Sequence, residues 1–250
     1  MPRFFIKKEQ IHRNGSHTQI VIDGNDAVHI SRSLRMRVGD ELIICDGDGR
    51  EYICTLSKIT DSEVTANVAG SRSCTSEPPY KVTVYQALVK GEKFDTVVQK
   101  SIECGAVSVV PFSSSRCTVK LKGSDVEKKR ARWQRIAEEA AKQCGRGIIP
   151  NIATALTFDE MINNAAKSDI VLFCYEKETL PLKATLAEKK ANGVTTDISV
   201  IIGSEGGFSD EEAHAAKSAG FSTVSLGKRI LRTESAAPFV LACLSYELEE

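Results

Sequence analysis

The sequence has no apolar run that could cross a membrane, since a spanning helix needs about 18 or more consecutive apolar residues. Its first ten residues, MPRFFIKKEQ, also lack the apolar stretch and the small-residue cleavage site of a secretory signal. These absences argue against a membrane-spanning or secreted protein. We therefore expect a cytoplasmic protein with no membrane partner.

Metal-ligand motifs are absent as well. The 8 cysteines include no C-x-x-C pair, and the 4 histidines are scattered without zinc-ligand spacing. We therefore expect no metal cofactor, and we interpret the cysteines as small buried thiols in a reducing compartment.

The chain also has no net charge, because 33 Lys and Arg balance 33 Asp and Glu. This balance hides an asymmetry: residues 71–150 carry 15 basic against 8 acidic side chains, whereas residues 151–250 carry 9 against 15. A basic middle third indicates a polyanionic partner reached through one face. The alternative is a solvated helix face, which charge alone favours.

The first 70 residues contain closely spaced short strands and little helix. Turn signals such as Gly39-Asp40 separate β-rich segments, a pattern typical of a small barrel. The stretch GSRSCTSEPPY (70–80) is the best linker in the chain, because its two prolines favour an extended backbone. We place a domain boundary after residue 73, which gives predicted domains at 1–73 and 74–250.

The rest of the chain alternates strand and helix patterns. We predict strands at 82–89, 107–110, 169–175, 197–202 and 223–226, and helices at 92–104, 124–144, 210–219 and 235–248. This order predicts the α/β fold class, with a mostly parallel sheet covered on both faces. Because proline is tolerated in the first helical turn, Pro238 makes Ser235 the expected cap of the last helix.

The helix at 124–144 is strongly basic. Lys128, Arg132 and Arg135 share one face at i, i+4, i+7 spacing, so that this face could follow the phosphates of a nucleic acid. Arg116 and Lys120 add charge just before the helix. Trp133 points elsewhere, and we interpret it as a core residue.

A glycine-rich turn follows the strand at 197–202, in the sequence VIIGSEGGFSDEE. Glycines at the carboxyl end of a strand let the backbone approach a ligand closely, and this edge is where open α/β sheets bind small molecules. The spacing is not that of a dinucleotide or phosphate loop, and Asp210 to Glu212 would repel a phosphate. The alternative is a tight turn without a function.

A second candidate loop is VSLGKRILRTESAA (224–237). Ile230 and Leu231 could line a pocket, and Arg232, Thr233 and Glu234 would lie on the loop before the last helix, where catalytic side chains are common. A structural salt bridge between Arg232 and Glu234 is the alternative.

Six segments in order carry a resemblance over essentially the whole chain: PRFFI, CDGDGREY, ALVKGEKFDTVVQKSIECGA, RWQRIAEEAAKQCGR, IIGSEGGFSDEE and SLGKRILRTESAA. The sequence resembles the RsmE family of 16S rRNA uridine-N3 methyltransferases, within the SPOUT class. It departs from the usual family pattern at Ser204, where proline is usual, at the segment 104–106, and at Ser235.

The resemblance implies a PUA-like RNA-binding barrel over 1–73 and a SPOUT domain over 74–250 with a C-terminal trefoil knot. It implies a homodimer that acts on a uridine in helix 44 of 16S rRNA in the small ribosomal subunit, with S-adenosyl-L-methionine as the methyl donor. The implied donor-binding residues lie on three loops: Phe173, Ile202, Gly203, Glu205, Gly206, Leu226, Gly227, Ile230, Leu231 and Thr233. The expected RNA-binding residues are Arg3, Arg32, Arg116, Lys128, Arg132 and Arg135.

The residues suit the chemistry that the resemblance implies. Uridine N3 must lose its proton to become a nucleophile, and the ring turns anionic as the sulfonium donor is neutralised. Arg232 is the best candidate to stabilise that anion, and Glu234 could accept the proton or only orient Arg232. Two other hypotheses stay open: a relative that methylates a different RNA, and an RNA-binding protein without catalysis.

Overall fold

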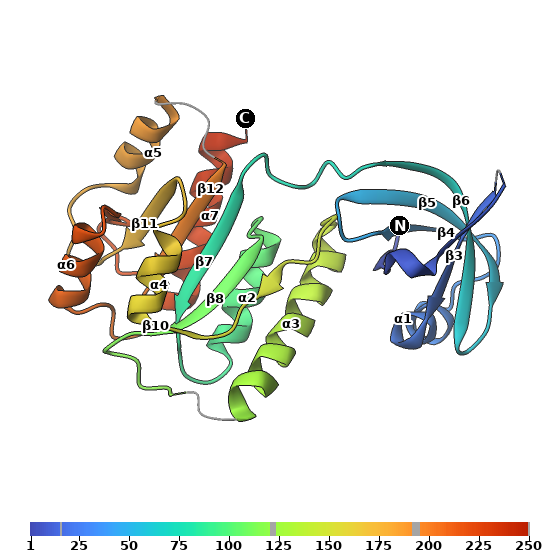
Figure 1. The fold of residues 1–250 in the computed structure, drawn as a ribbon, viewed down its shortest axis with the longest axis horizontal. Helices are drawn as coiled ribbons and strands as arrows, with labels where there is room; N and C mark the ends of the chain where they lie inside the picture. The colour runs from blue at the N-terminus through green and yellow to red at the C-terminus, as the bar shows by residue number, and fades with distance from the viewer. Residues whose placement is uncertain (16, 121–123, 192–195, 250) are drawn as a thin grey trace. The chain divides into compact units, whose positions relative to one another are not determined.

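The computed structural model describes residues 1–15, 17–120, 124–191 and 196–249. It divides the chain into two compact units (Figure 1). The first unit contains Met1–Glu77 and Ala141–Ile149, and the second contains Pro78–Ala140 and Pro150–Glu250. The sequence placed a boundary after residue 73 but did not predict that a later segment joins the first unit.

The first unit is built on a six-stranded sheet with the order β1-β4-β5-β6-β3-β2. Its elements are β1 (Arg3–Phe5), η1 (Lys8–Gln10), β2 (Ile11–Asn14), β3 (His17–Asp23), α1 (Gly24–Val28), η2 (His29–Ser33), β4 (Glu41–Cys45), β5 (Arg50–Ile59) and β6 (Glu63–Ser73). Only β1 and β4 pair in parallel. Within the described residues, no ladder joins the end strands β1 and β2, so backbone pairing does not close the predicted barrel.

Alternating apolar residues form the core of this unit. Ile20 and Ile22 on β3, and Leu42 and Ile44 on β4, are at most 1% exposed. Successive side chains of a strand point to opposite faces, so this alternation buries one face of the sheet.

The later segment is fixed to the first unit by one carboxylate. Glu77 accepts hydrogen bonds from the Arg146 guanidinium at 2.7–3.0 Å and from the Gly147 amide at 2.8 Å. Gly147 lies so close to Cys74 that a Cβ atom would come within 2.4 Å of the Cys74 Cβ. These partners are about 70 residues apart in the chain, which is why no local pattern predicted them.

The second unit contains a seven-stranded sheet. Its strands are β7 (Lys81–Ala87), β8 (Ser108–Ser113), β9 (Asn151–Ile152), β10 (Leu156–Thr157), β11 (Ile170–Cys174), β12 (Asp197–Ile202) and β13 (Ser222–Val224). The order is β10-β8-β7-β12-β11-β13, with β9 beside β8, and every pairing is parallel. The predicted α/β class with a parallel sheet is confirmed.

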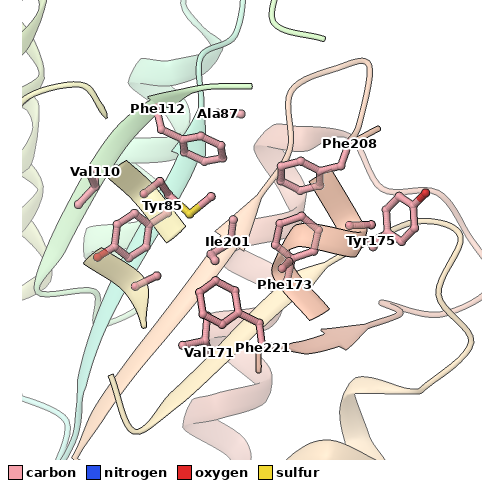
Figure 2. Close-up of a cluster of buried hydrophobic side chains, with 14 residues drawn as sticks. Tyr85, Ala87, Val110, Phe112, Val171, Phe173, Tyr175, Ile201, Phe208 and Phe221 are labelled. Carbon is pink, nitrogen blue, oxygen red and sulfur yellow. The ribbon is translucent and has the colours of Figure 1, made fainter. Parts of the chain in front are cut away.

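Helices cover both faces of this sheet. They are α2 (Lys93–Glu103), α3 (Ser124–Cys144), α4 (Phe158–Ala165), α5 (Leu182–Ala191), α6 (Asp210–Ser218) and α7 (Thr233–Leu248). On one face, residues of α4 and α6 pack with Tyr85, Phe112, Phe173 and Phe208 in a single apolar cluster (Figure 2). On the other face, α7 packs against β12, α2 and α5 (Figure 1).

The last helix begins at Thr233, two residues before the predicted cap, so the expectation based on Pro238 was wrong. Pro238 lies in the second turn instead, where it removes one backbone hydrogen bond. The early start has a tertiary cause: Thr233 is 7% exposed and its hydroxyl is bonded to the loop after β12. That contact fixes Thr233 and Glu234 in the first helical turn.

Parallel pairing places the carboxyl ends of β12, β11 and β13 at the same edge of the sheet. The loops that follow these three strands therefore come together, although they are separated in sequence by about 25 residues each. This edge is where ligands bind in open α/β sheets.

Candidate active site

The three loops line one cavity of about 480 Å³. Its walls come from residues 174–176 after β11, residues 202–208 at the end of β12, residues 225–236 after β13, and Lys93 at the start of α2. Small-molecule sites usually measure about 300–1,000 Å³, so the cavity is large enough for a nucleoside-sized ligand. We call residues 203–207 the glycine loop and residues 226–232 the arginine loop.

The backbone of the glycine loop is held by hydrogen bonds on both sides. The Gly203 carbonyl accepts from the Thr233 hydroxyl at 2.7 Å and from the Gln86 amide at 3.2 Å. Gln86 also donates to the Thr233 Oγ1 at 2.9 Å. One residue on, the Ser204 carbonyl accepts from the Gly207 amide at 3.0 Å. These bonds join β7, the glycine loop and α7 into one rigid wall.

Side chains from neighbouring loops lie close to Gly206 and Gly207. Gly207 has φ +64°, and a Cβ atom there would come within 2.4 Å of the Glu176 carboxylate. A Cβ at Gly206 would lie 3.1 Å from the Arg116 Cβ, and Arg116 Nη1 donates to the Gly206 carbonyl at 3.0 Å. Glycine suits this position because its φ is positive, and a Cβ here would also displace the exposed Glu176 carboxylate.

A lysine that the sequence did not single out completes this wall. Lys93 Nζ lies 2.9 Å from the Glu205 carboxylate, which also accepts from the Lys90 amide at 3.2 Å. Partial burial of the Glu205 carboxyl favours its neutral form. The hydrogen bonds from Lys93, from the Lys90 amide and from its own amide outweigh this effect and lower the pKa of the carboxyl. Glu205 is therefore a structural anchor as well as a lining residue.

The arginine loop forms an apolar and far more open wall. Leu226, Ile230 and Leu231 line the cavity, and Ile230 is 88% exposed. Gly227 has φ +106°, and a Cβ atom there would meet no other heavy atom of the described residues within 4 Å. The Gly227 amide donates to the Ser225 hydroxyl at 3.3 Å. At the other end of the loop, the Arg232 carbonyl accepts from the Ser235 and Ala236 amides at 2.9 and 3.1 Å, and residues 227–230 between the two ends are exposed.

Arg232 and Glu234 lie where this loop enters α7. Arg232 precedes the first helical residue, its side chain is 83% exposed, and its Nη1 lies 3.9 Å from the Glu234 Oε1. The Glu234 side chain is 20% exposed, and its Oε2 is buried without a hydrogen-bond partner in the described chain. This oxygen has an unmet hydrogen-bonding capacity, and a rotation of the carboxylate would be needed to offer it to a ligand.

The structure brings most of the predicted donor-binding residues together. Those that line the cavity are Ile202, Gly203, Glu205, Gly206, Leu226, Gly227, Ile230, Leu231 and Thr233, together with the predicted catalytic pair Arg232 and Glu234. Phe173 does not line it: its side chain is fully buried, with its ring 4.2 Å from that of Phe208 (Figure 2). Because side chains alternate along a strand, the next residue, Cys174, lines the cavity instead.

The sequence analysis missed several lining residues, among them the charged Glu176 and Lys93. Glu176 is the second residue after β11, and its position after a buried strand was a usable signal. Lys93 carried no such signal, because its role depends on the approach of α2 to the glycine loop.

In the first unit, the two arginines expected to bind RNA already have protein partners. Arg3 is 11% exposed, lies 2.7 Å from the Glu51 carboxylate, and donates to Cys45 Sγ. Arg32 is 65% exposed and lies 2.9 Å from Asp61. Arg32 is therefore accessible to a polyanion, whereas Arg3 contributes to the packing of its own unit.

On α3, the predicted basic face is exposed and the opposite face is buried. Lys128, Arg132 and Arg135 are all exposed. Arg132 forms an ion pair with Asp95 on α2 and lies 3.6 Å from Glu92. Trp133 is a core residue as predicted, 5% exposed with its ring 4.1 Å from that of Phe94.

Neither a metal site nor a membrane span is found in the residues that the structure describes. Across residues 1–15, 17–120, 124–191 and 196–249, no three His, Cys, Asp or Glu side chains form a group that could hold a metal ion. In the same ranges, no helix has the length and apolar character needed to cross a bilayer.

Comparison with known proteins assigns both units to a class. Residues 76–245 match the family described as RNA methyltransferase domain, and residues 22–69 match the RNA methyltransferase PUA domain. The parallel sheet with its strand-end cavity and the separate mixed sheet are thus the two parts of an RNA methyltransferase of this class.

Proteins that match this chain over its whole length identify one family within this class. The ribosomal RNA small subunit methyltransferase E of Bacillus subtilis is 32% identical over 253 residues, covering 100% of this chain and 98% of that protein. The same-named protein of Neisseria gonorrhoeae, solved bound to S-adenosyl methionine, superposes with a TM-score of 0.83 at 26% identity, covering 98% and 97% of the two chains. The chain belongs to the ribosomal RNA small subunit methyltransferase E family.

Proposed function

We propose that this chain transfers a methyl group from S-adenosyl-L-methionine to N3 of a specific uridine in helix 44 of 16S rRNA, within the small ribosomal subunit. The observation that carries the proposal is the cavity at the sheet edge, with Arg232 and the partnerless Glu234 Oε2 beside it. The names of the relatives support a ribosomal RNA substrate and this methyl donor.

The cavity suits the donor in size and chemistry. Leu226, Ile230 and Leu231 offer an apolar wall for an adenine ring, and backbone groups near Gly203 and Gly227 can meet its polar edges. Glu176 adds a carboxylate for the cationic part of the ligand. When bound, S-adenosyl-L-methionine supplies a methyl group on a sulfonium centre. A metal has no place in this scheme, because the leaving group departs as a neutral thioether.

Arg232 and Glu234 have separate roles at the uracil ring. In this proposal the Arg232 guanidinium donates hydrogen bonds to a uracil carbonyl oxygen and stabilises the negative charge that develops there. After a rotation of the carboxylate, Glu234 Oε2 accepts the N3 proton beside Arg232. In this proposal the main partner of the Arg232 guanidinium is the substrate, which accounts for the high exposure of the side chain in the protein alone.

RNA is held by exposed basic side chains in both units. Lys128 and Arg135 on α3 and Arg32 in the first unit would contact phosphates, and Arg132 would do so in competition with Asp95. Arg116 would link the RNA to the donor site, because its guanidinium is bonded to the glycine loop. Arg3 would act through the packing of the first unit, where it pairs with Glu51.

A homodimer, a trefoil knot and a cytoplasmic location complete the proposal. Exposed apolar side chains on α7, Phe239 at 39% and Tyr246 at 76%, support a dimer contact, which light scattering of the purified chain would test. Hydrogen bonds of Ser225 with Leu180 and Leu182 hold the segment before α7 against an earlier loop, which supports a knot. A stable domain fused to the C-terminus should then slow refolding more than the same domain at the N-terminus.

The decisive experiment maps methylated nucleotides of rRNA by mass spectrometry in a deletion strain, before and after complementation. We expect one N3-methyluridine in helix 44 to be lost and then restored. Restoration by the unmodified chain but not by Arg232→Ala would support the site assignment. A methyl group lost at another base or in another RNA would refute the substrate, and no loss at all would indicate an RNA-binding protein without catalysis.

A further inference from the structure

Glu212 on α6 is a buried carboxylate that bridges two segments far apart in the chain. The residue is 7% exposed. Its Oε1 accepts a hydrogen bond from the Ser115 amide at 2.7 Å, and its Oε2 accepts one from the Ser209 amide at 2.9 Å. A buried charge is costly unless it is hydrogen-bonded, so the carboxylate fixes the two amides that satisfy it. It therefore joins the segment 114–117, which follows β8, to the start of α6.

The cap of α6 does not require the bond to Ser115. Ser209 and Glu212 form a capping box, in which each side chain accepts from the backbone amide of the other. α4 begins with the same box, formed by Thr157 and Glu160, where the Glu160 Oε2 accepts both bonds that Thr157 donates. Glutamine serves in such a box as well as glutamate, because one side-chain oxygen is sufficient. The Oε1 of Glu212 thus has a role beyond the cap.

The residue after Ser115 is an exposed arginine that contacts the glycine loop. Arg116 Nη1 donates to the Gly206 carbonyl at 3.0 Å. Because that acceptor is neutral, the positive charge stays available to a phosphate. The backbone on the other side of Arg116 is held too, since Cys117 Sγ donates to the Leu88 carbonyl at 3.3 Å. A cation fixed in this way is preorganised for one phosphate beside the donor cavity.

We infer that Glu212 is a positioning residue for RNA binding: its carboxylate holds the segment 114–117 so that Arg116 meets an RNA phosphate. This inference rests on the proposed function and names a residue that acts through another. The expected effect is opposite to that of simple charge repulsion. Removal of a carboxylate would strengthen RNA binding if charge alone mattered, and it would weaken RNA binding if the carboxylate positions Arg116.

Glu212→Gln tests the inference, and Glu160→Gln is the matched control. Both substitutions remove one negative charge from a capping box and keep an oxygen for the cap, but Glu212→Gln also gives up the bond to Ser115. The probe is a fluorescently labelled helix 44 fragment of 16S rRNA, whose affinity would be measured by anisotropy. The same measurement is made for Arg116→Ala and for the double variant that combines it with Glu212→Gln.

We expect Arg116→Ala to weaken RNA binding about tenfold, as for the loss of one hydrogen bond to a charged group. Glu212→Gln should weaken it by no more than this, and the double variant should bind as Arg116→Ala does, because Glu212 acts through that side chain. Glu212→Asp keeps the charge but is one methylene too short to bridge both amides, so it should weaken RNA binding as well. With small subunits, Glu212→Gln should raise KM and leave kcat and donor affinity unchanged.

Unchanged or stronger RNA binding in Glu212→Gln would overturn the inference, as would losses that add in the double variant. An equal loss in Glu160→Gln would assign the effect to charge or helix capping. If the unmodified chain binds the RNA fragment without methylating small subunits, the proposed function fails while the binding series still decides the role of Glu212. Failure of the unmodified chain to bind RNA would refute both.

Discussion

The glycine loop and the arginine loop line the same cavity but are held in different ways. In the glycine loop, the carbonyls of Gly203, Ser204 and Gly206 all accept hydrogen bonds, and Glu205 is paired with Lys93. In the arginine loop, hydrogen bonds lie at the two ends, from the Gly227 amide to Ser225 and from the first amides of α7 to the Arg232 carbonyl, and the side chains of Ile230 and Arg232 are more than four-fifths exposed.

This difference indicates that the two loops serve two different functions, the binding of a small ligand and contact with a large partner. A wall that is fully bonded before the ligand arrives loses little conformational entropy on binding, which favours affinity for a small, constant ligand. An open wall with an unconstrained arginine can adapt to a large partner and make its contacts only when that partner is present. We therefore expect changes in the glycine loop to affect donor affinity and stability, and a change at the exposed Arg232 of the arginine loop to affect turnover.

Arg232→Ala tests the open wall and should have the largest effect. We expect kcat to fall by about 10²–10³, or roughly 2.7–4 kcal/mol, as for the loss of one hydrogen-bond donor to a developing oxyanion. Donor affinity and melting temperature should change little, because the side chain is 83% exposed. Arg232→Lys should rescue in part, since a point charge does not reproduce the planar fork.

Normal turnover of Arg232→Ala at saturating RNA would show that this arginine is not catalytic. Unfolding of the variant would instead assign it a structural pairing with Glu234. The measurement is single-turnover methylation of isolated small subunits, with calorimetric donor binding as the second readout.

A pair of glycine substitutions compares the two walls directly. Gly207→Ala and Gly227→Ala both place a side chain at positive φ, which costs about 1–2 kcal/mol of unfolding free energy. At Gly207 the new Cβ also meets Glu176, whereas at Gly227 it meets nothing among the described residues. Gly207→Ala should lose more donor affinity than Gly227→Ala, measured by calorimetry. Equal affinity losses in the two variants would contradict the proposed difference between the walls.

The third loop of the cavity, which follows β11, is anchored by the Glu178 carboxylate. This carboxylate makes the free energy of unfolding depend on pH in the acid range. Hydrogen bonds from Lys217, Thr223 and the Thr179 amide lower the pKa of Glu178 to about 2. A lowered pKa stabilises the fold above the unfolded value of about 4.3, and this contribution is lost as pH falls through about 2. Glu178→Gln should remove about 1 kcal/mol at neutral pH and flatten the acid dependence.

Chemical denaturation from pH 6 down to 2 would measure this effect. Glu188→Gln on the exposed surface of α5 is the control and should leave the acid dependence unchanged. The same pH profile in Glu178→Gln and the unmodified chain would show that the anchor does not contribute.

The smallest expected effect concerns the exposed face of α3. Arg135→Ala should reduce the log–log salt dependence of RNA binding by about 0.7–0.9, the value for one phosphate contact. Arg132→Ala should change the slope less, because Asp95 already neutralises that guanidinium. Donor binding should be unaffected in both. An unaltered slope in Arg135→Ala would favour a solvated helix face without an RNA contact.

Local sequence patterns predicted the elements of the site better than their connections. The glycine loop and the segment around Arg232 were found because glycines and charged residues after buried strands are visible in the sequence. The side chain of Phe173 was misplaced by one strand position, and the start of α7 by two residues. Both errors concern positions that are set by packing against other elements.

The sequence by itself determined the alternation of strands and helices, the parallel sheet and the loop residues at its edge, because burial follows a local period along the chain. Only the tertiary structure decided that Lys93 anchors Glu205, that Thr233 is bonded to Gly203, and that residues 141–149 join the first unit. Each of these contacts joins groups that are 30 or more residues apart in the chain. Such a contact forms only once the fold has brought the two groups together, so no local pattern of residues in the sequence indicates it.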